Sequence, residues 1–150
     1  MEEMLELFKI FSDESRLRIL LLLGEKELCV CQIMGVLNMS QPLISRNLSL
    51  LSKAGFLKDR REGKLMFYRI RKNLPGKHLL FLSLLNKVLN SDKIILKDLT
   101  SLRDCDDFQK KTGRCDMETL KEFMRRRESD QKGRRKALNK KAGRPGGRHV

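Results

Sequence analysis

Long hydrophobic runs are absent from this chain of 150 residues. The longest charge-free apolar run near its start covers only residues 19–23, whereas a membrane-spanning helix needs about 20 predominantly apolar residues and a signal peptide needs an apolar region of about 7–15. We therefore expect no membrane association and a location in the cytoplasm. A chain of this length can form one domain with a modest core and some appendages.

Residues suited to catalysis are also scarce. The chain has two His, and its His and acidic residues show no catalytic spacing. It contains neither a nucleophile–base set nor a phosphate-binding loop. The sequence therefore predicts a protein that is not an enzyme and has no organic cofactor.

Acidic residues are too few to balance the basic ones. There are 19 Asp and Glu against 33 Lys and Arg, so the formal net charge is +14 and the pI is near 10.0. Twelve of the basic residues and only three of the acidic ones lie in residues 121–150. Such an excess indicates a polyanionic partner, nucleic acid before a membrane surface.

Residues 27–54 form the segment around which the rest of the chain is organised. They read as a short helix over 27–37, a turn, and a second helix over 41–54 that begins after a suitable N-cap. One face of the second helix is apolar, and the opposite face carries short polar side chains that fit the DNA major groove. This helix-turn-helix pattern predicts DNA contacts by Ser40, Gln41, Pro42, Ser45, Arg46 and Ser49.

The next segment, residues 56–70, reads as a β-hairpin turning at Glu62-Gly63. Four basic side chains lie on its arms and tip, directly after the proposed recognition helix. A basic hairpin in this position can act as a wing that reaches phosphates or the adjacent minor groove. The predicted wing contacts are Arg60, Arg61, Lys64 and Arg69.

A helix over residues 77–90 has an apolar arc too broad for one small domain to cover. Exposed apolar patches of this size usually mark an interface, so we expect a homodimer whose two copies pair through this helix. The predicted interface residues are Phe81, Leu82, Leu85, Val88 and Leu89.

Three regions follow from these patterns. Residues 1–90 form a winged helix-turn-helix domain for DNA binding and dimerisation, 91–128 form a Cys-containing extension, and 129–150 form a basic tail that we expect to be disordered. The fold class is mainly α with a small β-hairpin. Residues 140–148 contain a Gly-Arg-Pro core like that of an AT-hook, although a plain disordered polycation is the preferred interpretation.

The chain resembles the ArsR/SmtB family of metalloregulatory winged-helix repressors over about residues 4–90. The resemblance rests on five segments in this order: FSDESRLRIL (11–20), ELCVC (27–31), SQPLISR (40–46), AGFL (54–57) and REGKLMFYRI (61–70). It implies a homodimer that represses its own operon by binding double-stranded DNA at an inverted-repeat operator. Ser40, Gln41, Ser45 and Arg46 match family DNA-contact positions, whereas Asn47 stands where the family often has His.

Cys29 and Cys31 occupy the sensor position of the arsenite- and lead/cadmium-responsive branches of the family. Thiolates select soft, thiophilic ions, and a helix N-terminus lowers a Cys pKa. On a regular helix the two side chains would point about 200° apart, so we expect the first helical turn to unwind when both bind one ion. Buried Cys residues that only pack are the plain alternative.

The third ligand and the inducer remain open at this point. Cys105 or Cys115 could supply a third sulfur, form a redox pair, or be incidental thiols, and Met34 is core filler rather than a ligand. The preferred function is a repressor released by arsenite, As(III). The alternatives are a Cd-, Pb- or Zn-responsive repressor, a metal-free redox or persulfide sensor, and an architectural DNA binder driven by its tail.

Overall fold

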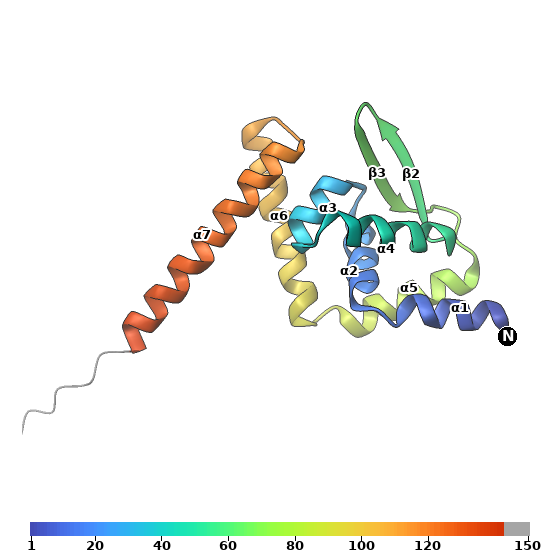
Figure 1. The fold of residues 1–150 in the computed structure, drawn as a ribbon. Coiled ribbons are helices and arrows are strands. Elements are labelled where there is room, and N and C mark those ends of the chain that lie inside the picture. The colour runs from blue at the N-terminus through green and yellow to red at the C-terminus, as the bar shows by residue number, and fades with distance from the viewer. Residues whose placement is uncertain (143–150) are drawn as a thin grey trace, which may run out of the picture.

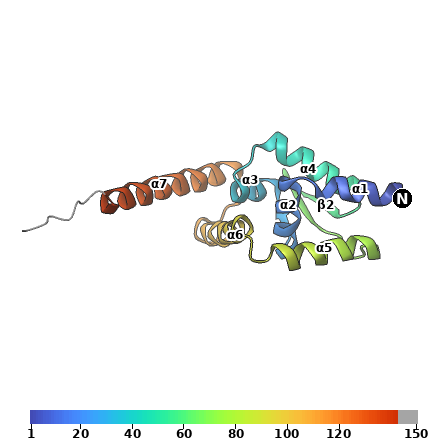
Figure 2. The ribbon, with the colours of Figure 1, turned by 90° about the horizontal axis from the view of Figure 1, so that it is seen from below.

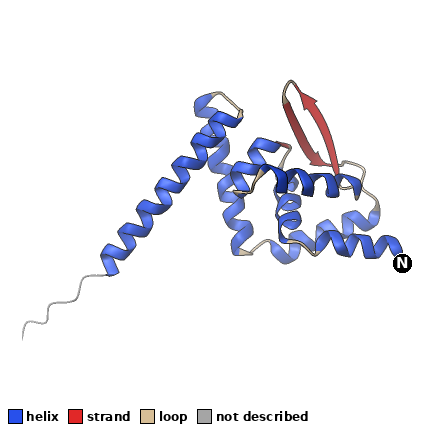
Figure 3. Ribbon diagram, in the orientation of Figure 1, coloured by secondary structure: helices blue, strands red, loops and turns tan. Residues whose placement is uncertain are grey.

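The computed structural model describes residues 1–142 as mainly helical, with a small antiparallel sheet of strand order β1-β3-β2 whose hairpin projects from the helices (Figures 1 and 3). This confirms the predicted fold class of mainly α structure with a β-hairpin, and it adds a third strand that the sequence did not predict. In chain order the elements are α1 (Glu2–Phe11), α2 (Glu14–Glu25), β1 (Leu28–Cys29), α3 (Val30–Leu37), α4 (Gln41–Lys53), β2 (Leu57–Glu62), β3 (Leu65–Ile70), α5 (Gly76–Leu89), α6 (Lys93–Thr112) and α7 (Met117–Ala142).

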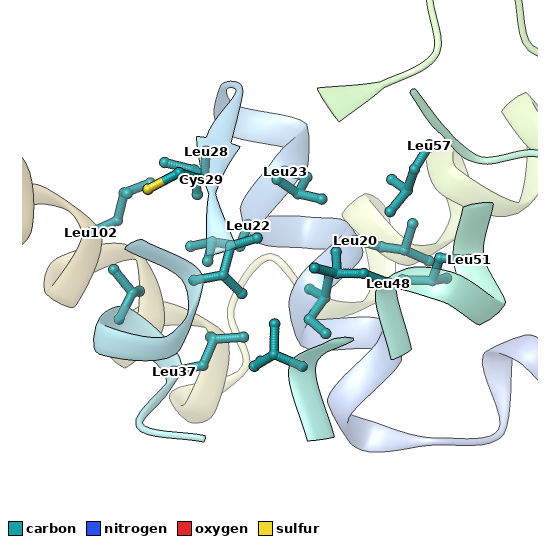
Figure 4. Close-up of a cluster of buried hydrophobic side chains, with 14 of the residues drawn as sticks. Leu20, Leu22, Leu23, Leu28, Cys29, Leu37, Leu48, Leu51, Leu57 and Leu102 are labelled. Atoms are coloured by element: carbon teal, nitrogen blue, oxygen red, sulfur yellow. The ribbon is translucent and has the colours of Figure 1, made fainter. Parts of the chain in front are cut away.

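Helix α2 is the centre of the core. Asp13 caps it by accepting a hydrogen bond from the Arg16 backbone N–H, and all five residues of the apolar run 19–23 are buried. Leucines from α3, α4, β2 and α6 surround it, with Leu48 and Leu51 of α4 on one side and Leu102 of α6 on another (Figure 4). No helix within residues 1–142 is both long and apolar enough to span a membrane.

The first helix of the helix-turn-helix starts later than the sequence predicts. Residues 28–29 do not begin a helix, because they pair with Tyr68 and Phe67 of β3 as a short strand, and α3 starts at Val30. Asn38 then adopts a left-handed conformation (φ 54°) that ends α3. Only Asn38, Met39 and Ser40 separate α3 from α4, so the two helices are closely coupled.

The wing has the predicted hairpin form. β2 and β3 pair from Leu57↔Ile70 to Glu62↔Leu65, and Gly63 has a positive φ of 59° in the turn between them. The wing stands beside α4 and projects beyond it (Figure 1). Recognition helix and wing therefore lie on the same part of the molecule.

Beyond α5, helix α6 forms a separate element of the Cys-containing extension. It packs against α2 and α3, and its Leu102 and Cys105 join the same core. The buried carboxylate of Asp98 accepts two hydrogen bonds from Arg18, at 2.7 and 2.8 Å. This ion pair between α2 and α6 fixes the extension on the winged-helix domain.

The prediction of a disordered tail is wrong for residues 129–142, because α7 continues through them and leaves the domain on the side opposite the N-terminus (Figures 1 and 2). The prediction of disorder rested on the lack of an apolar pattern in this segment. Once the first turns of a helix are held by packing, further residues add one hydrogen bond each, and this segment is rich in Lys, Arg, Ala and other good helix formers. Most of the AT-hook-like segment 140–148 lies outside the described residues.

The first half of α7 is held against α3 by a close contact. A Cβ added at Gly35 would lie 2.2 Å from Leu120 Cδ1, so only glycine leaves room for this side chain. Farther along α7, Arg127 donates to the backbone oxygen of Gly35 at 3.0 Å and to Ser101 Oγ of α6 at 2.6 Å. Helix α3 is thus enclosed by α4, α6 and α7.

We predict that Gly35→Ala destabilises the protein by about 1–3 kcal/mol, because the new methyl group overpacks the α3–α7 contact. Denaturant unfolding of the full chain measures this difference. Gly24→Ala is the matched control: it lies in α2, no atom comes within 4 Å of its added Cβ, and it should stabilise by about 0.5–1 kcal/mol. Equal free energies of unfolding for the two variants would show that Gly35 is not needed for the α3–α7 packing.

Candidate functional site

The predicted groove-reading residues lie together on the outer face of α4. Its inner face is buried through Ile44, Leu48 and Leu51. Ser40 occupies the N-cap, although its side chain makes no capping hydrogen bond. The exposed residues of the predicted set are Ser40, Gln41, Pro42, Ser45, Arg46 and Ser49.

Asn47 has a structural position rather than one on this face. It is buried, donates to the Leu43 backbone oxygen at 3.0 Å, and lies 3.5 Å from an Arg16 guanidinium nitrogen that donates to it. Arg16 in turn donates to the Ile10 backbone oxygen at 2.8 Å. Asn47 therefore links α4 to the start of α2 and does not point outward.

The four basic residues of the wing are not equivalent. Arg60 forms ion pairs with Glu27 at 2.6 Å and Glu62 at 2.7 Å, its guanidinium lies 4.4 Å from the Phe67 ring centroid, and the hydrogen bond to Glu27 chiefly raises its pKa. Arg69 is half-buried, and its guanidinium donates to the backbone oxygen of the neighbouring Ile70 at 3.4 Å. The exposed cations at the tip are Arg61 and Lys64, so these two are better placed for phosphates.

The cysteine residues form the second part of the candidate site. Cys29 is the N-cap of α3, with an extended backbone (φ −79°, ψ 160°), and its side chain accepts from the backbone at the third helical position. Its sulfur is 3.5 Å from Cys115 Sγ, which the chain brings in from the turn between α6 and α7. Sequence spacing gave no sign of this contact across 86 positions.

Cys29 and Cys31 do not stand on opposite sides of a helix. Because Cys29 lies before the first turn, the Cys31 thiol can hydrogen-bond to the Cys29 sulfur, and this bond is the largest cause that lowers the pKa of Cys29. The same bond chiefly raises the pKa of Cys31. The expectation that the first turn must unwind to bring the two thiols together is therefore wrong: β1 already holds Cys29 outside the helix.

Cys105, the fourth thiol, belongs to the hydrophobic core. Its side chain is fully buried in the core, and burial raises its pKa to about 11, with Asp106 adding a smaller contribution. A fully buried neutral thiol suits packing against α3 and α7.

The thiol geometry suits a soft ion, although the ligand set is incomplete as it stands. Two ligands about 2.3 Å from one ion, at bond angles of about 100–110°, lie about 3.5–3.8 Å apart, and the Cys29 and Cys115 sulfurs are 3.5 Å apart. Within residues 1–142, however, no three His, Cys, Asp or Glu side chains are already arranged to hold a metal ion. His78 is no donor here, since it is buried against Phe56 and hydrogen-bonded to the Ala54 backbone oxygen.

The apolar face of α5 differs from the predicted one. Phe81, Leu82 and Leu85 pack partly against the protein's own core, so of the predicted interface residues only Val88 is exposed, and Leu89 is half-buried. The Phe8 ring of α1 packs edge-on against Phe81 of α5 at 5.5 Å, which joins the two helices into one face. We call this the α1/α5 face; its exposed apolar residues are Leu5, Phe8, Leu79, Leu80, Leu84 and Val88.

These elements define a winged helix-turn-helix protein, and comparisons with known proteins agree. Residues 13–59 match the family described as bacterial regulatory protein, arsR family. An uncharacterized HTH-type transcriptional regulator of Methanocaldococcus jannaschii is 49% identical over 70 residues, which cover 46% of this chain and 79% of that protein. The chain belongs to the arsR family of bacterial regulatory proteins.

Two further relatives have named functions. The arsenical resistance operon repressor of Escherichia coli strain K12 is 51% identical over 73 residues, or 48% of this chain and 62% of that protein. The cadmium resistance transcriptional regulatory protein CadC of Listeria innocua is 43% identical over 65 residues, which cover 43% of this chain and 55% of that protein. The chain thus matches less than two thirds of the length of either relative.

Solved structures resemble about three fifths of the chain. HlyU from Vibrio cholerae has a TM-score of 0.53 and 27% identity over 60% of this chain and 95% of its own. The homodimeric winged helix-turn-helix domain Mb0332 from Mycobacterium bovis has a TM-score of 0.51 and 27% identity. The match covers 61% of this chain and 82% of the Mb0332 chain. These matches leave a large part of this chain uncovered.

Proposed function

We propose that the protein is a DNA-binding transcriptional repressor that a thiophilic metalloid or metal, foremost As(III), releases from its operator. The observation that carries this proposal is the position of Cys29 and Cys31 at the start of α3, the helix that leads directly into the exposed polar face of α4. A soft ligand bound there acts on the support of the recognition helix.

The DNA-binding part of the proposal rests on shape and charge. The outer face of α4 carries short polar side chains and Arg46, which suit the major groove, while Arg61 and Lys64 at the wing tip suit phosphates. The net charge of +14 adds long-range attraction to a polyanion.

Arsenite is preferred as inducer because of the donor type and the similarity to the Escherichia coli arsenical resistance operon repressor. Within residues 1–142, Cys29 and Cys115 contact each other through sulfur, and no hydrogen bond joins either sulfur to a His, Asp or Glu side chain that would favour a harder ion. The cadmium resistance relative keeps Cd, and with it Pb and Zn, as alternatives. Titrating the protein–DNA complex with each ion under reducing conditions tests the choice.

Coupling between thiols and DNA follows from the packing of α3. A ligand that binds Cys29 and Cys31 fixes the geometry of the N-cap and first turn of this helix. α3 is joined to α4 by a three-residue connection and enclosed by α6 and α7, so it shifts as a rigid unit. The ligand releases DNA if its affinity for the shifted arrangement exceeds its affinity for the DNA-binding one.

A second candidate function is metal-free thiol sensing. The 3.5 Å contact between Cys29 and Cys115 sulfurs favours it, because a small movement would allow a disulfide. The two thiols would then lose two protons and two electrons to an oxidant such as a peroxide. Release by peroxide without reductant, together with no release by arsenite under reducing conditions, would select this function.

We also propose a homodimer formed through the α1/α5 face, with two recognition helices about 34–36 Å apart on an inverted-repeat operator. An exposed apolar face spanning two helices is unusual for a monomer. Mb0332, one of the similar solved structures, is described as homodimeric.

We predict that Leu84→Glu yields monomers that bind DNA poorly, because it buries an unpaired charge in the interface. Leu84 is preferred to Leu85, which packs against the protein's own core. Leu138→Glu is the matched control, since Leu138 is 68% exposed on the far half of α7. Sedimentation measures the result, and a dimeric Leu84→Glu protein would rule out this interface.

The recognition helix α4 and the basic residues 129–150 should affect DNA binding differently. Arg46→Ala should mainly lower the preference for operator over random DNA, by about 1–3 kcal/mol if it reads a base. Removing residues 129–150, which leaves the buried residues of α7 intact, should weaken binding to all DNA. It should also reduce the salt dependence by about 0.9 log units for each phosphate that the removed residues neutralise.

The control for this pair is Lys121→Ala, which removes one exposed cation from α7. Binding to operator and random DNA is measured at several salt concentrations. If Arg46→Ala weakens both equally, Arg46 contacts phosphate and not a base. If the truncation leaves the salt dependence unchanged, the α7 end does not bind DNA.

For the switch, we predict that Cys29→Ser and Cys31→Ser each retain operator binding but lose release by arsenite. A hydroxyl fits the space of the thiol but is a hard, weak donor to a soft ion. Gel-shift titration with arsenite in the presence of a monothiol reductant measures this. Release of the Cys29→Ser,Cys31→Ser double variant at the wild-type arsenite concentration would reject these residues as the sensor.

A further inference from the structure

The turn between α6 and α7 places Cys115 against the start of α3, 86 positions after Cys29. This turn begins at Gly113, which takes a positive φ of 67° and ends α6. Cys115 is half-buried, while Cys29 is completely buried. Of these two touching thiols, Cys115 is therefore the one that a solute can reach first.

A ring of hydrogen bonds fixes the two sulfurs next to each other. The Cys29 backbone N–H donates to Gln32 Oε1 at 2.9 Å, Gln32 Nε2 donates to Gln109 Oε1 at 2.9 Å, and Gln109 Nε2 donates to Cys115 Sγ at 3.3 Å. The 3.5 Å contact between Cys115 and Cys29 sulfurs closes the ring. Because Gln32 is buried and belongs to α3 while Gln109 belongs to α6, this ring ties the extension to the sensor segment.

We propose that Cys115 is the third sulfur ligand of the inducer, so that the bound metalloid joins the C-terminal extension to the start of α3. This inference rests on the proposed function, in which Cys29 and Cys31 bind the inducer. Cys115 touches the Cys29 sulfur, and Cys31 lies in the first turn of α3, directly after the Cys29 N-cap. Cys29 is thus the common neighbour of both partners.

The chemistry is a condensation without electron transfer. Arsenous acid, As(OH)3, forms three As–S bonds with the three thiols, and three As–OH bonds break. Each thiol proton leaves with one hydroxyl as water, so three waters are released and arsenic stays trivalent. Reaction begins at half-buried Cys115, and the metalloid then passes inward to Cys29 and Cys31 by exchange of its remaining hydroxyls.

Cys105 differs from Cys115 in its contacts. Cys115, not Cys105, is the thiol whose sulfur contacts that of Cys29 at 3.5 Å. Cys105 is fully buried in the core beside a cavity of about 10 Å³, and the Arg18–Asp98 ion pair holds α6, which carries it, against α2. Cys105 therefore serves as the matched control for Cys115.

The consequence for the switch lies at both ends of α3. Arg127 and Leu120 of α7 already hold the C-terminal half of α3. The bound inducer would draw the beginning of α7 toward the N-terminus of α3 through Cys115. The extension would thus transmit the inducer to the helix-turn-helix, and the protein without it would respond more weakly.

The test uses the reduced full-length chain, sodium arsenite, and the variants Cys115→Ser and Cys105→Ser. Titration of accessible thiols in mild denaturant before and after arsenite binding gives the number of sulfurs that each arsenic protects. We expect three in the wild type and in Cys105→Ser, but two in Cys115→Ser. Arsenite should bind Cys115→Ser at least tenfold more weakly, and operator release should need correspondingly more arsenite.

A phenylarsenic(III) probe separates the removal of one ligand from misfolding. It has two exchangeable positions and so needs two thiols, which Cys29 and Cys31 still provide; Cys115→Ser should bind it within about twofold of wild type. If Cys115→Ser binds arsenite as wild type does while Cys29→Ser does not, Cys115 is no ligand and the proposed function stands. If Cys105→Ser is the variant that protects only two thiols, the assignment to Cys115 is overturned in favour of Cys105. If wild-type protein binds arsenite through none of its thiols, the proposed function itself fails.

Discussion

The pairing of two residues, Leu28 and Cys29, with β3 determines where α3 begins, and the thiol arrangement follows from it. This pairing keeps Cys29 extended, makes it the N-cap, and leaves Cys31 in the first helical turn. Had the helix started two residues earlier, the two side chains would have pointed in nearly opposite directions. A strand of two residues therefore keeps Cys29 out of the helix, so that its side chain is not held on the side opposite Cys31.

Helix α3 is then the element that joins the parts of the molecule. Its first turn carries the thiols, its C-terminal half packs on α7 through Gly35, and its end leads to α4 within three residues. Closely packed interiors shift between discrete arrangements rather than deforming smoothly. For this reason a small change of sulfur geometry at one end of α3 can shift the exposed polar face of α4.

The extension belongs to the same core as the winged helix. Leu102, Cys105, Leu120 and Phe123 pack with residues of α2 and α3, and Asp98 and Arg127 add polar contacts to α2 and α3. Only the exposed far half of α7, with six Lys and Arg between residues 132 and 141, stands free of this packing. HlyU and Mb0332 cover about three fifths of the chain.

The sequence alone determined the elements that depend on local patterns. Periodicity located α2 and α4, Asp13 marked a helix start, Gly63 marked the hairpin turn, and the segments shared with the arsR family identified the fold. Contacts between distant residues were decided only by the tertiary structure. Strand β1 exists because β3 is beside it, α7 extends past residue 128 because its first turns are packed on α3, and Cys115 meets Cys29 because α6 and α7 fold back on that helix. No local propensity encodes such contacts, since their stability comes from partners far away in the chain.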